Sequence, residues 1–149
     1  MGTNDQTKNT SRLLLLDDDT DLLKTLQDIL HLKNYNPITV TRGEQALNIV
    51  TKQDIAVAVL DIRLEDMDGL DVLNEIRQRS PSTECILLTG HATQASAIEA
   101  VNRGAYSYLQ KPFEMEQLLL TIQHALEKQA MEQALRNSEQ RYRTVFDHA

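Results

Sequence analysis

The sequence predicts an α/β fold: a five-stranded parallel sheet, doubly wound with helices on both faces, followed by a C-terminal helical extension. Short apolar runs alternate five times with segments whose apolar residues recur at helical spacing. Residues 55–60 form six consecutive apolar positions, several of them β-branched, which indicates a strand buried on both faces as in a parallel sheet. Strict strand–helix alternation favours right-handed crossovers and a helical layer on each side.

Each element follows from a local pattern of residues. The expected strands are short apolar or β-branched runs, at residues 13–16, 38–41, 55–60, 85–89 and 106–109. Apolar residues at helical spacing predict helices around residues 22–30, 46–50, 70–76 and 94–102, with a last helix starting near Glu114. Gly104 follows the fourth helix, as expected of a C-terminal cap.

Composition excludes several classes of protein. The 149 residues favour one compact domain with some additional helix, and a net charge of −7 argues against nucleic acid as a direct partner. No apolar run approaches the ~18 residues that a membrane-spanning helix needs, and polar residues 1–11 are expected to form a disordered lead-in. Cys85 is the single cysteine, which excludes an internal disulfide and fits a reducing cytoplasm. Its apolar surroundings favour a small buried side chain over a reactive thiol.

Polar residues stand where four of the expected strands end. The carboxyl ends of parallel strands meet at one edge of the sheet, and ligands bind in the crevice outside them. These residues are Asp17, Asp18 and Asp19 after the first strand, Asp61 after the third, Thr89 after the fourth, and Lys111 with Pro112 after the fifth. The topology therefore brings several carboxylates, one hydroxyl and one ammonium to the same rim.

These side chains suit phosphoryl transfer assisted by a divalent cation. Clustered carboxylates repel one another and raise their own pKa values, and a cation relieves that repulsion. Oxygen ligands with room for water favour Mg²⁺. Asp61 is the expected nucleophile because it stands alone on the central strand, whereas the adjacent Asp17 and Asp18 are suited to holding the metal. Lys111 and the metal would neutralise the phosphoryl oxygens, and Thr89 would donate a hydrogen bond to one of them.

Residues 12–128 resemble the receiver domain of two-component response regulators. The family pattern is an acidic pair after strand one, a phosphorylated Asp after strand three, Ser or Thr after strand four, and Lys-Pro after strand five. The matching residues here are Asp17 and Asp18, Asp61, Thr89, and Lys111 with Pro112. Motifs in this order at the expected strand ends are specific to the family. The resemblance implies a flavodoxin-like fold, in which a βα unit occurs five times.

The resemblance also implies roles that the residue pattern alone does not assign. The Lys111-Pro112 peptide bond is cis in this family. The main-chain carbonyl of Arg63 would complete the shell of Mg²⁺, or of Mn²⁺ in its place. Tyr108 falls at the position of the family's switch aromatic and, with Thr89, would report phosphorylation to the surface of the fourth and fifth helices. Core packing is the alternative role for Tyr108.

By the same resemblance, a histidine kinase or a phosphotransfer protein would present phosphohistidine to this chain. The chain would transfer the phosphoryl group to Asp61 and later hydrolyse the acyl phosphate. Self-phosphorylation and autodephosphorylation are the only reactions expected of it. Phosphorylation would shift the population between two conformations, with homodimerisation through the helix-four to helix-five surface or through the C-terminal helix. The expected compartment is the cytoplasm.

Several residues depart from the family pattern. Glu65 stands where Pro is common, so the loop after Asp61 is expected to be less rigid, and Gly90 replaces the more usual Ala. Arg63 and His91 are bulky at the positions that tune phosphoryl loss in this family. The phosphorylated form is therefore expected to have a lifetime different from that of chemotaxis receivers, in a direction that the sequence leaves open.

Two other functions remain open on the sequence. Residues 17–20 follow an apolar strand and resemble the haloacid-dehalogenase phosphatases, in which the first Asp is the nucleophile. That family has Thr or Val where this chain has Asp21, and the chain lacks room for the usual cap domain. The second alternative is a degenerate receiver that docks without being phosphorylated, which the complete set of site residues argues against. Asp19 and Asp21 are expected only to start a helix.

Helical patterning continues through residues 129–149 as a polar, glutamine-rich segment. Met131, Leu135, Tyr142 and Val145 keep a loose heptad spacing offset from the preceding apolar residues, which indicates a linker with a break in its coiled-coil register. A solvated single helix is an equal alternative. Residues 137–146 resemble the opening helix of a PAS sensory domain. The chain is then expected to be an N-terminal piece of a hybrid histidine kinase or another PAS-containing regulator, although no kinase motif is present to decide.

Overall fold

The computed structural model describes residues 12–90 and 94–147, in which strands alternate with helices. The strands are β1 (Leu13–Leu16), β2 (Ile38–Val40), β3 (Val57–Asp61), β4 (Glu84–Thr89) and β5 (Ser107–Gln110). The helices are α2 (Thr20–Leu32), α3 (Gly43–Lys52), α4 (Gly69–Arg79), α5 (Gln94–Asn102) and α6 (Met115–Asp147). The lead-in expected at residues 1–11 lies outside the described residues.

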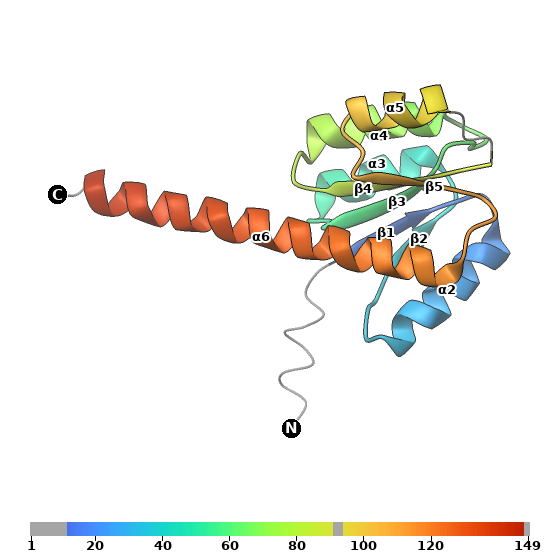
Figure 1. Cartoon of the computed structure of the whole chain (residues 1–149), viewed down its shortest axis with the longest axis horizontal. Helices are drawn as coiled ribbons and strands as arrows, with labels where there is room; N and C mark the ends of the chain where they lie inside the picture. Colours follow the sequence, from blue (N-terminus) through green and yellow to red (C-terminus); the bar gives the residue numbers. More distant parts are fainter. Residues whose placement is uncertain (1–11, 91–93, 148–149) are drawn as a thin grey trace.

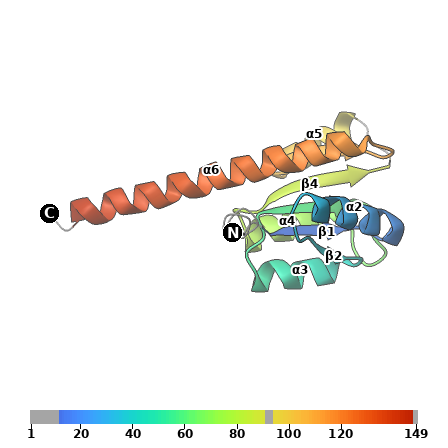
Figure 2. The same cartoon turned by 90° about the horizontal axis from the view of Figure 1, so that it is seen from below.

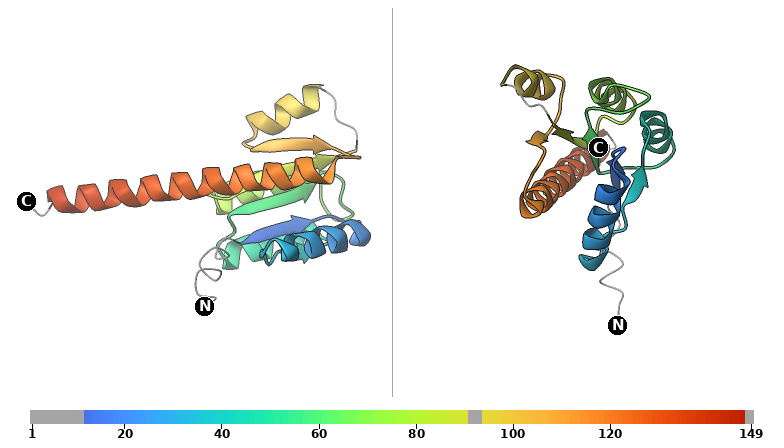
Figure 3. Two further views of the ribbon diagram at one scale, coloured as in Figure 1. Left: turned by 60° about the horizontal axis from the view of Figure 1, so that its bottom comes forward. Right: turned by 90° about the vertical axis from the view of Figure 1, so that its right-hand side faces the viewer.

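The strands form one parallel sheet in the order β2-β1-β3-β4-β5. Helices α3, α4 and α5 cover one face, and α2 and α6 cover the other (Figure 1, Figure 3). The predicted doubly wound fold is therefore confirmed. Successive residues of β1 point to opposite faces: Leu14 and Leu16 join the core under α3 and α4, whereas Leu13 and Leu15 join the core under α2 and α6.

The central strand β3 is buried along its whole length. The apolar run that predicts it begins at Ile55, but Ile55 and Ala56 are buried ahead of the ladder, and the strand extends instead to Asp61. Asp61 pairs in register with Leu88 of β4, and the amide of the next residue, Ile62, donates to the Leu88 carbonyl at 3.0 Å. The pairing with β4 therefore fixes the backbone from which the Asp61 side chain starts.

Local chemistry sets where several helices begin and end. Asp19 caps α2 by accepting a hydrogen bond from the amide of Leu22 at 3.1 Å, which confirms its expected place at a helix start. Asp68 caps α4 in the same way, accepting from the amide of Leu70 at 2.9 Å. Gly104 has a φ of 98° just after α5, the left-handed conformation in which glycine closes a helix at little steric cost.

Cys85 is part of the core of the sheet. It lies in β4 with none of its surface exposed. Burial raises the pKa of its thiol to about 12, so the reactive thiolate is strongly disfavoured. The expectation of a small buried side chain is confirmed.

Helix α6 has 33 residues and continues well past the sheet (Figure 1, Figure 2). Its first turns bury Leu118, Ile122 and Ala125 against the sheet, whereas Met131 and Leu135 are 72% and 60% exposed further along. The predicted helical extension is confirmed, and its pairing in a coiled coil stays a prediction. The side chains of residues 142 and 145, the last of the heptad pattern, lie outside the described residues. Within the described ranges no helix, α6 included, is both long and apolar enough to cross a membrane.

An ion pair fastens α6 to the sheet close to where the helix leaves it. Lys128 Nζ lies 2.9 Å from Glu84 Oε2 and 2.8 Å from Glu132 Oε1, and 5.9 Å from the centre of the Tyr106 ring. Glu84 is the first residue of β4, and its side chain is only 6% exposed. A buried carboxylate is costly without a countercharge, which Lys128 supplies.

We expect Lys128→Met to lower the free energy of unfolding by about 1–2 kcal/mol, because the Glu84 carboxylate loses its cation while the apolar stem of the side chain is kept. Urea unfolding at neutral pH measures the change. Lys24→Met is the matched control, since Lys24 and Asp28 form an ion pair with both side chains exposed, which is expected to contribute less than about 0.5 kcal/mol. Equal effects of the two substitutions would contradict a special role for the Glu84 pair.

Candidate functional site

Three carboxylates meet at the carboxyl edge of the sheet. Asp17 and Asp18 follow β1 and Asp61 ends β3, and the pairing of Leu16 with Leu60 brings these strand ends side by side. Each carboxylate offers an oxygen within 4.8 Å of the oxygens of the other two. Asp17 and Asp61 are buried, at 2% and 5% exposure, whereas Asp18 is exposed. The structure thus places together the acidic residues that the sequence assigns to one rim.

Lys111 brings a positive charge to these carboxylates. Its Nζ lies 2.8 Å from Asp17 Oδ2 and 3.6 Å from Asp61 Oδ2. The Lys111 amide donates to the Thr89 carbonyl at 2.7 Å, which holds the chain beside β4 after β5 has ended and fixes where the side chain starts. The Lys111-Pro112 peptide bond is cis, as the resemblance implies.

Burial and charge act differently on the buried Asp61 and on the half-buried Lys111. Burial, and next the charge of Asp17, raises the pKa of Asp61 to about 6, although Lys111 and the Arg63 amide oppose the shift. Burial alone would lower the pKa of Lys111, but its hydrogen bond to Asp17 and the charges of both carboxylates hold that pKa above its ordinary value. The ammonium therefore stays charged, and it neutralises only part of the negative charge around it.

Thr89 and Tyr108 lie on β4 and β5, the two strands next to β3 on its far side from β1. Thr89 is buried at the end of β4, the strand that pairs with β3. Tyr108 of β5 and Tyr106 just before it are half-buried and pack into the cores on opposite faces of the sheet. Tyr108 also lines a hollow with Ile98 and Val101 of α5. This packing is compatible with both a switch role and a core role for Tyr108.

Helix α4 starts in direct contact with the end of β3 because its first residue is Gly69. The Gly69 amide donates to the Ile62 carbonyl at 2.7 Å. A Cβ atom at Gly69 would lie 2.3 Å from the Asp61 carbonyl oxygen and 2.5 Å from the Ile62 Cα, far inside any van der Waals contact. The absence of a side chain at this residue therefore sets how closely the loop after Asp61 can close.

That loop carries the other residues assigned by resemblance. The Arg63 amide donates to Asp61 Oδ1 at 3.3 Å. The backbones of Arg63 and Asp68 also form an isolated antiparallel β-bridge across the loop. The use of the Arg63 carbonyl as a metal ligand stays a prediction. Glu65 is exposed on the loop, and His91, the other residue expected to tune the site, lies outside the described residues.

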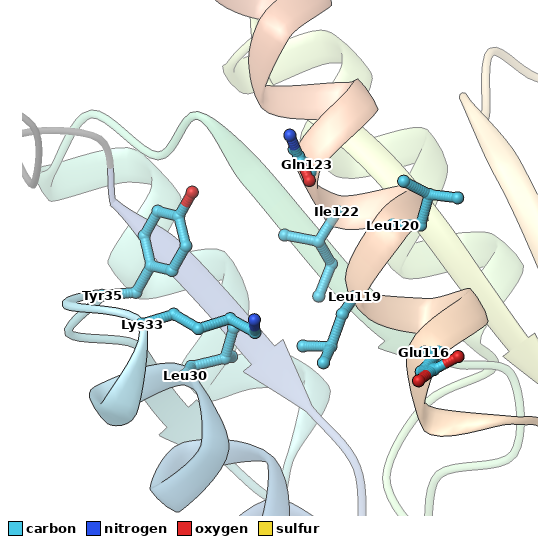
Figure 4. Close-up of a pocket in the computed structure, with 8 residues that line it drawn as sticks. All are labelled: Leu30, Lys33, Tyr35, Glu116, Leu119, Leu120, Ile122 and Gln123. Carbon is cyan, nitrogen blue, oxygen red and sulfur yellow. The ribbon is translucent and has the colours of Figure 1, made fainter.

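A separate groove lies at the opposite end of α2 from these acidic residues. It runs between the last turn of α2, with the loop that follows, and the first turns of α6 (Figure 4). Its walls are formed by Leu30, Lys33, Tyr35, Glu116, Leu119, Leu120, Ile122 and Gln123. None of these residues belongs to the predicted site.

The acidic cluster fits a small, hard divalent cation. Its three candidate ligand atoms are carboxylate oxygens, and the exposure of Asp18 leaves room for water. Mg²⁺ keeps several waters and takes a few carboxylate ligands. A cation would also offset the negative charge that Lys111 leaves uncompensated.

Comparisons with known proteins agree on one family. The family model described as the response regulator receiver domain matches residues 13–123. The regulatory protein AtoC of Escherichia coli (strain K12) is 32% identical over 136 residues, which are 91% of this chain and 30% of that protein. The transcriptional regulatory protein GlrR of the same strain is 33% identical over 120 residues, 80% of this chain and 27% of that protein.

One solved structure is similar to this chain over almost the whole of its own length. It is a CheY-like response regulator receiver domain protein from Methanospirillum hungatei JF-1, with a TM-score of 0.78 and 30% identity. The similarity covers 82% of this chain and 98% of that one. By contrast, the chain spans less than a third of the length of the two curated relatives.

We expect Gly69→Ala to destabilise the fold by about 3 kcal/mol, because a methyl group cannot fit against the Asp61 backbone and the overlap outweighs the ~1 kcal/mol that alanine gains in a helix. Thermal or urea unfolding measures the effect. Gly90→Ala is the control, since no atom of the described residues lies within 4 Å of a Cβ there. A Gly69→Ala protein as stable as the Gly90→Ala protein would contradict the close approach.

We expect Asp61→Asn to stabilise the metal-free protein at about pH 7 by about 2 kcal/mol. Folding raises the pKa of Asp61 from 3.8 to about 6, so the folded state holds this proton more tightly and loses relative stability as pH rises through that window. The amide removes the cost, and the gain should vanish near pH 4, where the carboxyl is protonated in the folded wild type. Urea unfolding with a chelator at both pH values tests this. The exposed Asp54→Asn is the control, and a gain independent of pH would be contradictory.

Proposed function

This chain belongs to the family of response regulator receiver domains of two-component signalling, and from that premise we propose that Asp61 accepts a phosphoryl group in a Mg²⁺-dependent reaction. The donor is a phosphohistidine on a histidine kinase or a phosphotransfer protein. The single observation that carries the proposal is the geometry of the rim: the Asp61 carboxylate lies with Asp17 and Asp18 in one cluster, 3.6 Å from Lys111 Nζ.

Asp61 is the residue of this cluster best placed to attack. One oxygen of Asp17 accepts from the Asp19 amide at 2.9 Å and the other pairs with Lys111 at 2.8 Å, so both are already engaged. Asp61 Oδ1 accepts a longer hydrogen bond, 3.3 Å from the Arg63 amide. An Asp61 oxygen would form the new bond to phosphorus as the P–N bond breaks, and the electron pair of that bond stays on the imidazole nitrogen of the donor.

The other residues of the rim stabilise charge in this reaction. Asp17, Asp18 and the Arg63 carbonyl would hold Mg²⁺ or Mn²⁺ together with Asp61, and the bound cation neutralises the phosphoryl oxygens. Lys111 is within reach of the same oxygens once they lie on Asp61, and its raised pKa keeps it cationic. Thr89 would donate a hydrogen bond to a phosphoryl oxygen from the end of β4.

The signalling consequence is a shift between two conformations. Thr89 and Tyr108 lie on the paired strands β4 and β5. Tyr108 is opposite Leu87, two residues before Thr89. Tyr108 packs toward α5, so a change at Thr89 has a direct route to that surface. Homodimerisation through this surface or through α6 would be the readout.

The residues after the receiver, 129–149, are proposed to link it to a further domain in the same polypeptide. The support is that α6 runs beyond the sheet with its Met131 and Leu135 side chains exposed, and that the curated relatives are much longer than this chain. A PAS sensory domain, as in a hybrid histidine kinase or another PAS-containing regulator, is the downstream domain that the sequence of 137–146 favours. A cytoplasmic location is proposed with it.

A dehalogenase-type phosphatase is the second candidate because Asp17 directly follows a parallel strand. That mechanism requires Asp17 to be the nucleophile, whereas its engaged oxygens favour a holding role. A receiver that only docks is the third candidate, and the fit of the acidic cluster to a cation disfavours it. The phosphatase and the docking module predict different results in the experiment that follows.

We expect the wild-type chain to gain one phosphoryl group from a small phosphodonor, such as acetyl phosphate, in a reaction that a chelator of Mg²⁺ abolishes. Asp61→Asn should lose this uptake because an amide does not replace the carboxylate as nucleophile. Intact-mass spectrometry measures both. Asp21→Asn is the control, since Asp21 is an exposed acid of the α2 first turn outside the cluster.

Uptake that persists at the wild-type level in Asp61→Asn would refute the assignment. Loss with Asp17→Asn alone, accompanied by turnover of free phosphate esters, would favour the dehalogenase-type mechanism. A wild type that takes up no phosphate and binds no Mg²⁺ would favour the docking module.

A further inference from the structure

Asp66 makes a long-range contact that links the loop after Asp61 to the start of α3. Its Oδ1 accepts from the Gly43 amide at 2.9 Å and its Oδ2 accepts from the Glu44 amide at 3.1 Å. Arg42 Nε lies 4.0 Å from the same carboxylate, whose side chain is only 12% exposed. These hydrogen bonds, with that of Gly43 the largest influence, lower the pKa of Asp66. The carboxylate is therefore charged at neutral pH and held by both oxygens.

The contact exists because α3 lacks an acceptor of its own. The residue at its N-cap is Arg42, and a guanidinium has no acceptor atom for the first amides of a helix. Gln45 Oε1 accepts from the amides of Thr41 and Arg42, at 3.2 Å each, which leaves the next two amides of the helix to Asp66. A carboxylate at a helix N-terminus is also favoured by the helix dipole.

The tip of the loop packs on the same helix start. A Cβ atom at Gly43 would lie 2.9 Å from Met67 Sδ, so the absence of a side chain there lets the loop approach α3 closely. The two ends of the loop are held separately, by β3 and by the Asp68 cap of α4. Asp66 and Met67 thus fix the middle of the loop, beyond the β-bridge between Arg63 and Asp68.

We propose that Asp66 is a positioning residue for the cation site, acting through the loop that carries the Arg63 main-chain carbonyl; this rests on the proposed Mg²⁺ function. Glu65 stands where a proline would stiffen the loop. In this chain the Asp66 cap supplies that stiffness from outside, by fastening the loop to a helix whose own residues pack in the core. Within residues 12–90 and 94–147, no hydrogen bond or ion pair joins Asp66 to the proposed ligands Asp17 and Asp61, so its effect on the cation would be carried by the loop backbone.

The test measures how tightly the unphosphorylated chain binds Mn²⁺, with the free ion quantified by electron paramagnetic resonance. Asp66→Ala should weaken binding by about tenfold, as removal of an outer support of a metal ligand does. Asp66→Asn should weaken it by only about threefold, since one amide oxygen can still accept. In phosphorylation by acetyl phosphate, Asp66→Ala should need correspondingly more Mg²⁺, while its rate at saturating Mg²⁺ returns to the wild-type value.

The matched control is Thr83→Val, which removes the buried hydrogen bond from Thr83 Oγ1 to the Ile55 carbonyl at the opposite edge of the sheet. It should lower Tm and leave the Mn²⁺ Kd unchanged. Asp66→Ala with a lowered Tm and the wild-type Mn²⁺ Kd would overturn the inference and leave the proposed function intact. Asp17→Asn that binds Mn²⁺ as tightly as the wild type would instead overturn the cation site, and the role of Asp66 with it.

Discussion

The structure depends on holding Asp17 and Asp61 together, with most of their surface out of water, at the ends of two neighbouring parallel strands. Two like charges in such a setting cost free energy when both ionise, and the charge of Asp17 helps to raise the pKa of Asp61. Lys111 lies against both carboxylates and offsets part of that cost, and the exposed Asp18 adds further negative charge. The site therefore carries an excess of negative charge, which a divalent cation can relieve.

The parallel sheet explains how this arrangement is held. Asp61 lies within the β3 ladder, and Lys111 is placed by a backbone hydrogen bond to the end of β4, so both side chains start from fixed points. The loop between β3 and α4 packs closely on the end of β3 at Gly69, and the Asp66 cap holds its middle. At the opposite edge Glu84 and Lys128 fasten α6, so the edge that carries the chemistry and the edge from which the helix leaves share the same strands.

Much of the fold and the acidic rim could be predicted from the sequence, because a buried parallel strand leaves a strong apolar run and the residue after it is easily found. The exact ends of strands are less visible: Ile55 and Ala56 are buried like ladder residues but lie ahead of the ladder. Asp66 left no local signal, since the amides it caps are 22 and 23 residues away. The one hint was a helix start at Arg42 with no acceptor. The polar sequence after residue 128 is equally compatible with a solvated single helix and with a coiled coil.

The central claim is that the phosphoryl group becomes an acyl phosphate on Asp61. Borohydride reduces an acyl phosphate to an alcohol and so converts a phosphorylated aspartate to homoserine, which peptide mass spectrometry can locate. After phosphorylation with Mg²⁺ and a small phosphodonor, we expect homoserine at residue 61 alone and none when a chelator is present. Homoserine at Asp17, or phosphate that survives borohydride on another type of residue, would contradict the claim.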